Sequence, residues 1–521
     1  MRRALLLLAV LGCAGKPTPP PPALAAAAAA QPAEGKGPDL SYWEHRKDLI
    51  QPPPPPQPRP LELPKVESWT LRNGLEVIVV PRSELPAVTF GVAIKAGGYD
   101  ESHDRLGLAS FTAEMLRKGT KRSNADQISA LIDGVGGSLE ASASDEHSVA
   151  TCTVLAKDRG VCFRLLQETL LSPTFPEVEM GEIRDRMLGG INQRYDDPGS
   201  LASAHFDAEL FGDEHPDGWV PMPDDVRRIG RADLVKFWKT YYRPNNGLLV
   251  MAGDVGALPA LRAEIEKAFG GWAKGPIPAR PELKLPEHKG VRTLLVDKDD
   301  LTQSTLMFGH AGVRHTDPAW YAVTVMNYVL GGSDFSSRLM MEVRSKRGLT
   351  YGISSSFGES LYQGAFEVNA ATKNESVWDA FAASVAEIRR IKAEGPSAEE
   401  VQKAHGYYAG SYPFQLQSAS SLAGGIAAAQ LQGLGVDYVR DLAVRLGAVD
   451  VAAAKAAAAA YLHPDDLTVV IVGKGAAVAP QLDKAGVKYE RIDYRAPFSA
   501  AARAAKPGPP APPAAAPTPA R

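Results

Sequence analysis

The strongest constraint on the fold is a pattern of strands followed by helices that runs twice along the 521-residue chain. Each run closes on a short, continuously apolar segment, at 247–253 in the first half and at 467–473 in the second. Segments of this length and composition are typical of buried strands. The repetition therefore predicts a duplicated α+β unit, with each copy roughly 210 residues long.

Alternation, turn residues and helix stop signals predict the individual elements. Asn73-Gly74 supplies the tight turn of a hairpin over 69–80. Asn374 is placed to cap a helix over 375–393. Further strands are expected at 88–96, 139–155, 292–296, 304–309, 351–357 and 364–371. Further helices are expected at 106–116, 125–135, 159–171, 177–195, 232–242, 320–330 and 336–345.

Residues 1–13 are typical of an export signal. Arg2 and Arg3 form a short basic start, and residues 4–11 form an apolar run too short to span a bilayer. The next residues, up to Cys13, resemble a bacterial lipoprotein cleavage site, although Leu11 stands where a smaller residue is more usual. We expect Cys13 to become a lipidated N-terminus that anchors an exported protein in the periplasm or at the outer membrane. Simple secretion is the alternative.

Proline and alanine dominate both ends of the chain. Residues 14–62 form a linker that cannot bury a core, and residues 498–521 form a tail that we expect to be disordered. A Pro-rich stretch near 275–288 marks the boundary between two globular domains, which we place at 63–282 and 283–497. The net charge of -3 gives no general reason to expect nucleic acid as a partner.

Two cysteines, Cys152 and Cys162, lie within the first domain. An exported protein meets an oxidising compartment, so a disulfide between them is permitted. Two small buried thiols are the other interpretation, and the sequence leaves both open. Their spacing is not a metal-binding pattern.

Three stretches carry a resemblance to a known family. The first is Gly-Leu-Ala-Ser-Phe-Thr-Ala-Glu-Met-Leu-Arg-Lys-Gly-Thr at 107–120. It resembles the signature helix of the pitrilysin/insulinase (processing-peptidase-like) zinc metallopeptidases, Gly-Leu-Ala-His-Phe-Leu-Glu-His-Met-Leu-Phe-Lys-Gly-Thr. The second, at 336–351, is similar to a second-domain segment in which an Arg and a Tyr flank the substrate. The third, Tyr-Tyr-Arg-Pro-Asn-Asn at 241–246 and the strand after it, resembles the end of the family's first domain.

This resemblance covers residues 66–495 and implies a fold class. It implies an α+β protein of two similar domains, each a mostly antiparallel sheet with helices packed on one side. The two domains are expected to face each other and to enclose a chamber. Because a closed chamber admits only extended chain, the implied substrate is an unfolded peptide.

The zinc motif of the family is degenerate here. In active members, His-x-x-Glu-His places two zinc ligands and a catalytic Glu on one helical face, and a later helix supplies a third ligand, also a Glu. Ser110 and Glu114 take the two His positions, and Ala113 takes that of the catalytic Glu. Gly189 or Gly190 falls where the third ligand is expected. Ser is a poor zinc ligand and Ala cannot act as a base, so we expect no metal or other cofactor in this chain.

The ten histidines offer no replacement for the lost motif, because no other His-x-x-Glu-His occurs. His310 and His315 are five positions apart near a strand end, which is the wrong spacing for a pair on one helical face. We expect both to be structural. A rescue site built from Glu114 and distant groups is the alternative.

The second-domain motif is intact. Arg344 and Tyr351 stand seven positions apart, and the resemblance assigns both to catalysis, as donors to the peptide carbonyl or the developing oxyanion. Without the motif, they are an ordinary surface Arg and a strand Tyr. Gly331-Gly332 is either a mobile loop that contacts substrate or a simple helix stop.

The segment 138–144 matches the edge strand on which the family lays an extended peptide, and Ser142 and Ala143 are its candidate substrate-binding residues. The other interpretation is an ordinary edge strand with no ligand. Small side chains at these positions suit the close approach of a second backbone.

Some members of the family divide zinc and the Arg/Tyr pair between two chains. We therefore expect this chain to be the non-metal subunit of a two-subunit peptidase, active only with a homologous partner that carries zinc. Two rival hypotheses are a catalytically inactive peptide-binding or structural module of the same fold, and a stand-alone hydrolase with an unorthodox site.

The export signal generates a test at Cys13. The substitution Cys13→Ser should release the protein into the soluble fraction or block its maturation, because the acyl chains that hold it at the membrane are lost. Fractionation and the mass of the mature N-terminus check this. Unchanged fractionation together with an N-terminus free of acyl groups would point to simple secretion.

Overall fold

The computed structural model describes residue 62, residues 64–283 and residues 285–504, all within one compact unit of the chain. The export signal, Cys13 and nearly all of the linker lie outside the described residues, as do residues 505–521 of the tail.

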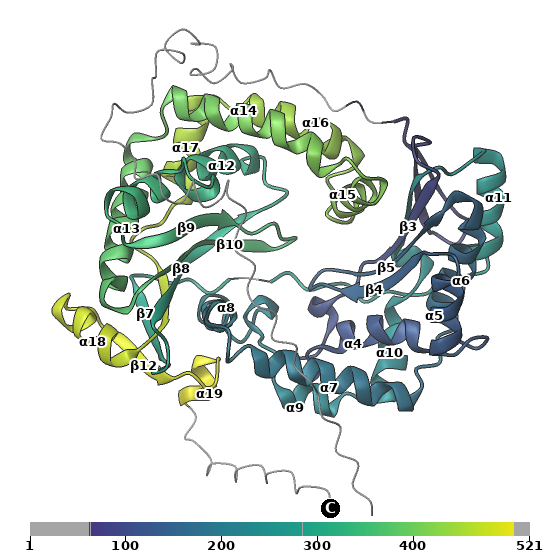
Figure 1. Cartoon of the computed structure of the whole chain (residues 1–521), viewed down its shortest axis with the longest axis horizontal. Coiled ribbons are helices and arrows are strands. Elements are labelled where there is room, and N and C mark those ends of the chain that lie inside the picture. Colours follow the sequence, from purple (N-terminus) through teal and green to yellow (C-terminus); the bar gives the residue numbers. More distant parts are fainter. Residues whose placement is uncertain (1–61, 63, 284, 505–521) are drawn as a thin grey trace, which may run out of the picture. The chain divides into compact units, whose positions relative to one another are not determined.

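Two six-stranded sheets form the framework, one from each half of the chain (Figure 1). The strand order is β1-β2-β6-β3-β5-β4 in the first sheet and β12-β7-β11-β8-β10-β9 in the second. All pairings are antiparallel except β2 with β6, β7 with β11 and β7 with β12. The first-sheet strands are β1 (Glu67–Thr70), β2 (Glu76–Pro81), β3 (Ala87–Ile94), β4 (Ser138–Ala143), β5 (Ser148–Leu155) and β6 (Gly247–Gly253). The second-sheet strands are β7 (Arg292–Asp297), β8 (Gln303–Arg314), β9 (Thr350–Phe357), β10 (Gln363–Lys373), β11 (Thr468–Gly473) and β12 (Tyr489–Asp493).

One face of each sheet is covered by helices of its own half (Figure 1). The apolar side chains between sheet and helices form two separate cores. Helices α4 (Leu108–Met115), α5 (Ala125–Asp133) and α6 (Arg159–Leu171) contact the first sheet, and α10 (Arg231–Tyr241) packs on α4. Helices α12 (Trp320–Asn327), α13 (Val377–Glu394) and α18 (Gly475–Lys484) contact the second sheet, and α17 (Val451–Tyr461) packs on α12 and α13. The predicted α+β fold with two similar, mostly antiparallel halves is confirmed.

The opposite face of each sheet is covered by a helix from the other half of the chain. Helix α15 (Ala419–Leu431) contacts β3 and β6 of the first sheet, with Leu422 and Ile426 buried. Helix α8 (Pro198–Phe211) contacts β8 and β11 of the second sheet, with Leu201 and Phe206 fully buried. This exchange explains why the closing strands β6 and β11 are buried along their whole length.

The predicted hairpin at the start of the first sheet is confirmed. Thr70 pairs with Glu76, and Gly74 closes the turn at φ +93°, a conformation that favours glycine. The Asn73 side-chain amide donates to the carbonyl oxygens of Phe269 at 2.7 Å and of Trp272 at 3.1 Å. The turn is thereby fixed to the end of α11 (Leu258–Phe269).

Three predicted elements differ in the structure. The alternating segment 139–155 is two strands, β4 and β5, because residues 144–147 turn back through mutual backbone and side-chain hydrogen bonds. Asn374 does not cap α13; its side chain instead accepts from Ser304 at 2.7 Å and joins β8 to β11. The helix expected at 336–345 contains a π-helical turn, η7 (Met340–Lys346), which ends at the Arg/Tyr segment.

Several elements were not predicted from the sequence, including α8, whose Asp197-Pro198 start is a recognisable helix signal. Its Asp197 side chain accepts from the backbone of Ser200 at 2.6 Å. The other unpredicted elements are β12, α9 (Pro223–Arg228), α11, α14 (Ala398–Gln415), α15, α16 (Val436–Gly447), α17, α18 and α19 (Ala500–Ala504). The remaining predicted helix, α7, spans Glu177–Gln193.

The start of the tail is ordered, contrary to the expectation for 498–521. Phe498 is buried in the core between α8 and the second sheet. Arg503 pairs with Glu209 of α8 and with Glu490 of β12. One aromatic anchor and one bridging guanidinium are enough to hold this segment against the body, although its composition resembles that of the flanking residues.

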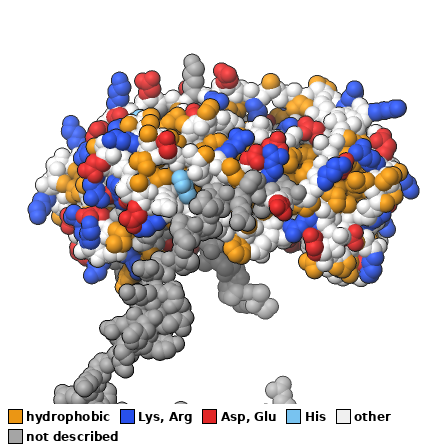
Figure 2. Space-filling model, turned by 90° about the horizontal axis from the view of Figure 1, so that it is seen from above, with side chains coloured by type: hydrophobic (Ala, Val, Ile, Leu, Met, Phe, Trp, Pro, Cys, Tyr) orange, Lys and Arg blue, Asp and Glu red, His pale blue; other side chains and the backbone are white. Residues whose placement is uncertain are grey.

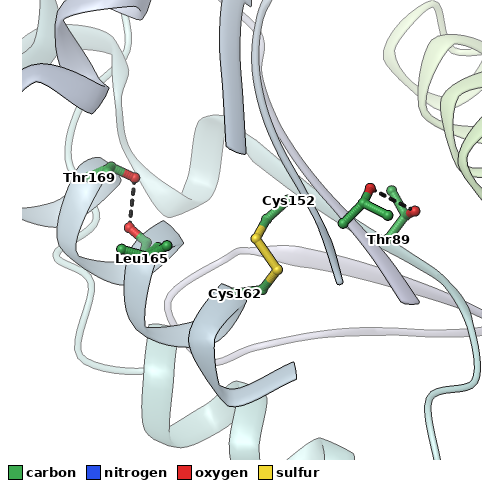
Figure 3. Close-up of a disulfide and its surroundings, with 6 residues drawn as sticks. Thr89, Cys152, Cys162, Leu165 and Thr169 are labelled. Carbon is green, nitrogen blue, oxygen red and sulfur yellow. Dashed lines mark hydrogen bonds between the residues drawn. A yellow bond between two sulfur atoms is a disulfide. The ribbon is translucent and has the colours of Figure 1, made fainter. Parts of the chain in front are cut away.

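A disulfide joins Cys152 of β5 to Cys162 of α6, which resolves the two interpretations that the sequence left open (Figure 3). Both residues are fully buried in the first core. The bond ties the helix layer to the sheet at the point where Phe90 and Phe163 pack edge to face.

Replacing Cys152 and Cys162 together by Ala should lower the free energy of unfolding by about 2–3 kcal/mol, because the loop that the bond closes is short. Urea unfolding of the oxidised protein checks this, with Cys13→Ser as the matched control that leaves stability unchanged. An unfolding midpoint equal to that of the parent protein would show that the bond does not form in solution.

Candidate active-site residues

The helix that carries the degenerate zinc motif is held at its N-terminus by a buried carboxyl group. Both oxygens of Glu101 accept backbone hydrogen bonds, from Gly107 at 2.7 Å and from Ala109 at 2.6 Å. These donors are among the unpaired N–H groups at the start of α4. Burial raises the pKa of Glu101 to about 8, against the effect of the two hydrogen bonds. The position of α4 is therefore fixed although both zinc-binding histidines of the motif are replaced on it.

The residue at one of the two histidine positions of the zinc motif forms an ion pair. Glu114 of α4 pairs with Arg186 of α7, the helix from which the family's third ligand would come. The guanidinium places a positive charge next to this carboxylate, which disfavours the binding of a second cation there. Ala113, at the position of the catalytic Glu, is fully buried, and Ser110 is partly buried.

The position of the family's third zinc ligand has space for a side chain but carries no side chain that could bind zinc. A side chain at Gly189 or Gly190 would meet nothing within 4 Å, so packing does not require glycine at either position. Among the described residues there is no group of three or more His, Cys, Asp or Glu that could hold a metal ion. The residues present do not fit the zinc centre of the family.

The side chains of His310 and His315 both lie within hydrogen-bond distance of other residues of the fold. His310 is buried, its Nδ1 lies 2.8 Å from the carbonyl oxygen of Ala311, and its Nε2 accepts from the backbone of His463 at 3.0 Å. Burial lowers the pKa of His310 to about 4. His315 lies within hydrogen-bond distance of Gln432 and Tyr438. Neither residue is available as a metal ligand.

Arg344 and Tyr351 lie on adjoining elements of the second half, η7 and the start of β9. A tight turn with Gly348 at φ +64° joins them. The Tyr351 side chain is 86% exposed, and Arg344 stacks on the exposed ring of Phe335, 4.9 Å from its centroid. The neighbouring cations Lys346 and Arg347 both pair with Glu342. An aromatic ring therefore orients the Arg344 guanidinium, and no carboxylate among the residues that the structure describes forms an ion pair with it.

Ion pairs of Arg338 hold in place the segment that carries Arg344 and Tyr351. The partly buried Arg338 donates two hydrogen bonds of 2.8 Å to the two carboxylate oxygens of Glu400 and also approaches Glu387. Burial opposes ionisation of Glu400, yet hydrogen bonds from Arg338 and Ser397 hold its pKa at about 2. This pair ties the motif to α13 and α14.

Gly331 lies in a π-helical turn, η6 (Tyr328–Gly332), that packs on β9. A side chain at Gly331 would come within 2.4 Å of the Ser355 hydroxyl, so glycine is needed there for close packing. Gly332 is exposed beside it. The structure thus gives Gly331 a packing role, and a substrate contact of this loop stays a prediction.

Ser142 and Ala143 lie on β4, which is the edge strand of the first sheet. The side chains of β4 alternate between buried and exposed, and that of Ser142 is exposed. Strand β9, with Tyr351, is the corresponding edge of the second sheet. A free edge offers unpaired backbone groups to an extended peptide, and binding at Ser142 and Ala143 also stays a prediction.

An acidic cavity was also not predicted from the sequence. A cavity of about 550 Å³ lies between the halves, and its lining includes the acidic side chains Asp145, Glu146, Asp207, Asp217 and Glu359. These residues come from four separate segments of the chain, so no local sequence motif predicts the cluster.

The chain belongs to the insulinase (M16) family of peptidases. The family described as "Insulinase (Peptidase family M16)" matches residues 77–213, and "Peptidase M16 inactive domain" matches residues 228–405. The suspected pitrilysin/insulinase resemblance is thereby confirmed.

Similar proteins are known from bacteria and plants. An uncharacterized zinc protease of Streptomyces coelicolor is 28% identical over 390 residues, covering 74% of this chain and 84% of the relative. A probable mitochondrial-processing peptidase subunit beta of Arabidopsis thaliana is 24% identical, covering 79% of each chain. Among solved structures, a peptidase M16 inactive domain from Pseudomonas fluorescens has a TM-score of 0.73 and 27% identity, covering 78% of this chain and 98% of its own.

The zinc-site geometry predicts the metal content of the protein. The purified chain alone should contain no stoichiometric zinc, because Arg186 already balances Glu114 and no neighbouring donor completes a ligand set. Elemental analysis after dialysis checks this. If each chain holds one zinc tightly and the Glu114→Ala variant loses it, the conclusion that this chain has no zinc site is wrong.

Proposed function

We propose that this chain is the non-metal subunit of a two-subunit M16 peptidase that cleaves extended peptides. The observation that carries the proposal is that Arg344 and Tyr351 are retained in a chain whose metal site is degenerate. An ordered Arg and a Tyr that is 86% exposed contribute little to the core, whereas the positions that would hold zinc offer only an internal ion pair.

The partner is a homologous chain that carries the zinc. The similarity to a processing-peptidase beta subunit supports a divided enzyme of this kind. The exposed ring of Phe335, beside Arg344, adds apolar surface next to the motif, where a protein partner could cover it. On the face drawn in Figure 2, charged and hydrophobic side chains are interspersed, so the partner is argued from individual residues and not from overall charge.

The contribution of this chain to the reaction is to bind and polarise the peptide. The Tyr351 hydroxyl and the Arg344 guanidinium donate hydrogen bonds to the carbonyl oxygen under attack, whose negative charge grows in the transition state. The edge strand β4, with Ser142 and Ala143, holds the peptide by adding it to the sheet. Zinc and the attacking water belong to the partner.

We also propose that the protein is exported and anchored by lipid at Cys13, with residues 14–62 as a spacer to the globular body. No helix among the described residues is long and apolar enough to cross a membrane.

A second candidate is a catalytically inactive peptide-binding or structural module. The description of the Pseudomonas fluorescens neighbour as an inactive domain favours it, as does the Glu114–Arg186 pair, which stabilises α4 and α7 without metal. The two candidates differ in one respect: only the split enzyme needs the Arg344 and Tyr351 side chains for turnover.

Arg344→Ala and Tyr351→Phe should each lower kcat of the reconstituted complex by about 10²–10³-fold, because each removes a transition-state donor. Steady-state cleavage of a peptide by the complex measures kcat and KM, and assembly and melting temperature serve as controls. Lys346→Ala, which removes a neighbouring exposed cation of the same turn, is the matched control and should leave kcat unchanged. If both motif variants assemble and cleave at the parental rate, this chain contributes no catalytic groups. The second candidate, an inactive peptide-binding or structural module, is then favoured.

A further inference from the structure

Helix α14 carries two exposed aromatic side chains on one face. Tyr407 is 47% exposed and Phe414 is 71% exposed. Residues seven apart along an α-helix lie on nearly the same side of it, so the two rings belong to one surface, which we call the aromatic stripe. Another face of α14 is packed into the fold through Val401, Ala404 and Tyr412. The aromatic stripe is therefore exposed on a helix that is otherwise well anchored.

The aromatic stripe is ordered and lies in an uncharged part of the helix. The Tyr407 ring packs 4.9 Å from the ring of Tyr328, which belongs to the turn η6. No Asp, Glu, Lys or Arg occurs from residue 404 to residue 415. Only the small residues Gly410 and Ser411 lie between the two rings on this side of the helix. Such a surface suits a neutral, apolar ligand and has no charge to attract an ionic one.

The chain enters the globular body next to the C-terminal end of α14. Glu67 of β1 lies opposite Val79 of β2, so β1 traced backward leads toward Arg82, which directly follows β2. The Arg82 side chain donates at 2.9 Å to the carbonyl oxygen of Gln417, two residues beyond the end of α14. Val66 packs on an apolar cluster to which this end of α14 also contributes. The linker therefore joins the body within reach of the aromatic stripe.

The segment that precedes this entry point is nearly all proline. Residues 52–60 read Pro-Pro-Pro-Pro-Pro-Gln-Pro-Arg-Pro. Runs of proline favour the polyproline helix, which has three residues per turn and rises about 3.1 Å per residue. At that rise nine residues span about 28 Å, close to the roughly 27 Å of an 18-residue α-helix such as α14. The segment is thus long enough to lie along the whole helix.

The repeat of a polyproline helix matches the spacing of the two rings. The seven residues from Tyr407 to Phe414 rise about 10.5 Å along the helix axis. Prolines three apart, such as Pro55 and Pro58, lie on one side of a polyproline helix and are about 9 Å apart. Proline-rich segments in this conformation bind to grooves lined by aromatic side chains. Two prolines of the segment can therefore each stack on one ring.

We propose that residues 52–60 dock as a polyproline helix along the aromatic stripe. Pro58 stacks on Phe414, and Pro55 stacks on Tyr407. The docked segment fixes the direction in which the linker leaves the body and shortens the free part of the spacer. The docking is independent of zinc, of a partner chain and of the catalytic roles proposed for the second-half motif.

The test uses the full-length chain with Cys13→Ser and two spin labels, at Gln57→Cys in the linker and Gln402→Cys on α14. Gln402 is exposed, and the native disulfide leaves no other thiol to take up a label. Pulsed electron paramagnetic resonance should give one narrow label-to-label distance of at most about 30 Å, because both labels lie along one helix. A linker that does not dock would give a broad distribution.

Tyr407→Ala combined with Phe414→Ala should broaden the distribution by about twofold or more, because the segment then behaves as a free chain. Pro55→Gly combined with Pro58→Gly should do the same while leaving α14 unchanged. Val178→Ala, which truncates an 85% exposed apolar side chain on α7, is the matched control and should keep the narrow distance. Circular dichroism checks that each variant is folded.

A broad distribution in the parent chain would overturn the proposal, as would a narrow one that survives in both folded double variants. If the parent distribution is broad and the chain forms concentration-dependent dimers that Phe414→Ala abolishes, a second copy covers the aromatic stripe and the proposal is wrong.

Discussion

Each half of the chain contributes one helix that covers the sheet of the other half, and the rest of the structure depends on this exchange. Each sheet has two apolar faces, and the helices of its own half cover only one. Helix α15 covers the second face of the first sheet, and α8 covers the second face of the second. Burying a large aliphatic side chain such as Ile426 contributes roughly 1.5–3 kcal/mol, so each half would lose several such terms if it stood alone. The halves therefore fold as partners, and the sites on them are held in one body.

Within this frame, the zinc site was replaced without loss of the helices that formed it. Glu101 fixes the start of α4, and the Glu114–Arg186 pair joins α4 to α7. The other half keeps its motif on a well-anchored segment, because Arg338 holds that segment to Glu400. These two observations, a metal site without its ligands and an ordered Arg/Tyr motif at the surface, are the basis for proposing that the chain works beside a second chain.

Sequence patterns predicted many of the local elements, chiefly those of the first half and of the second sheet, and the motif positions, because these depend on neighbours along the chain. Asn73-Gly74 specifies its hairpin by backbone preference alone, and the signature segments place Ser110 and Tyr351 by spacing. The patterns could not show which surface covers a buried face, so the exchange of α8 and α15 was missed. They also could not show that Arg186 neutralises Glu114, since that pairing depends on how two helices pack. The acidic cavity was not predicted for the same reason, because its lining residues come together only in the folded chain.

The central claim is that catalysis is divided between this chain and a zinc-bearing partner. The most direct measurement is co-purification of this protein from its native cells, followed by zinc analysis and peptide cleavage by the complex and by each separated chain. The account predicts one zinc per complex, located in the partner, and cleavage only when both chains are present. Cleavage by the partner alone at the rate of the complex, or by this chain alone, would contradict it.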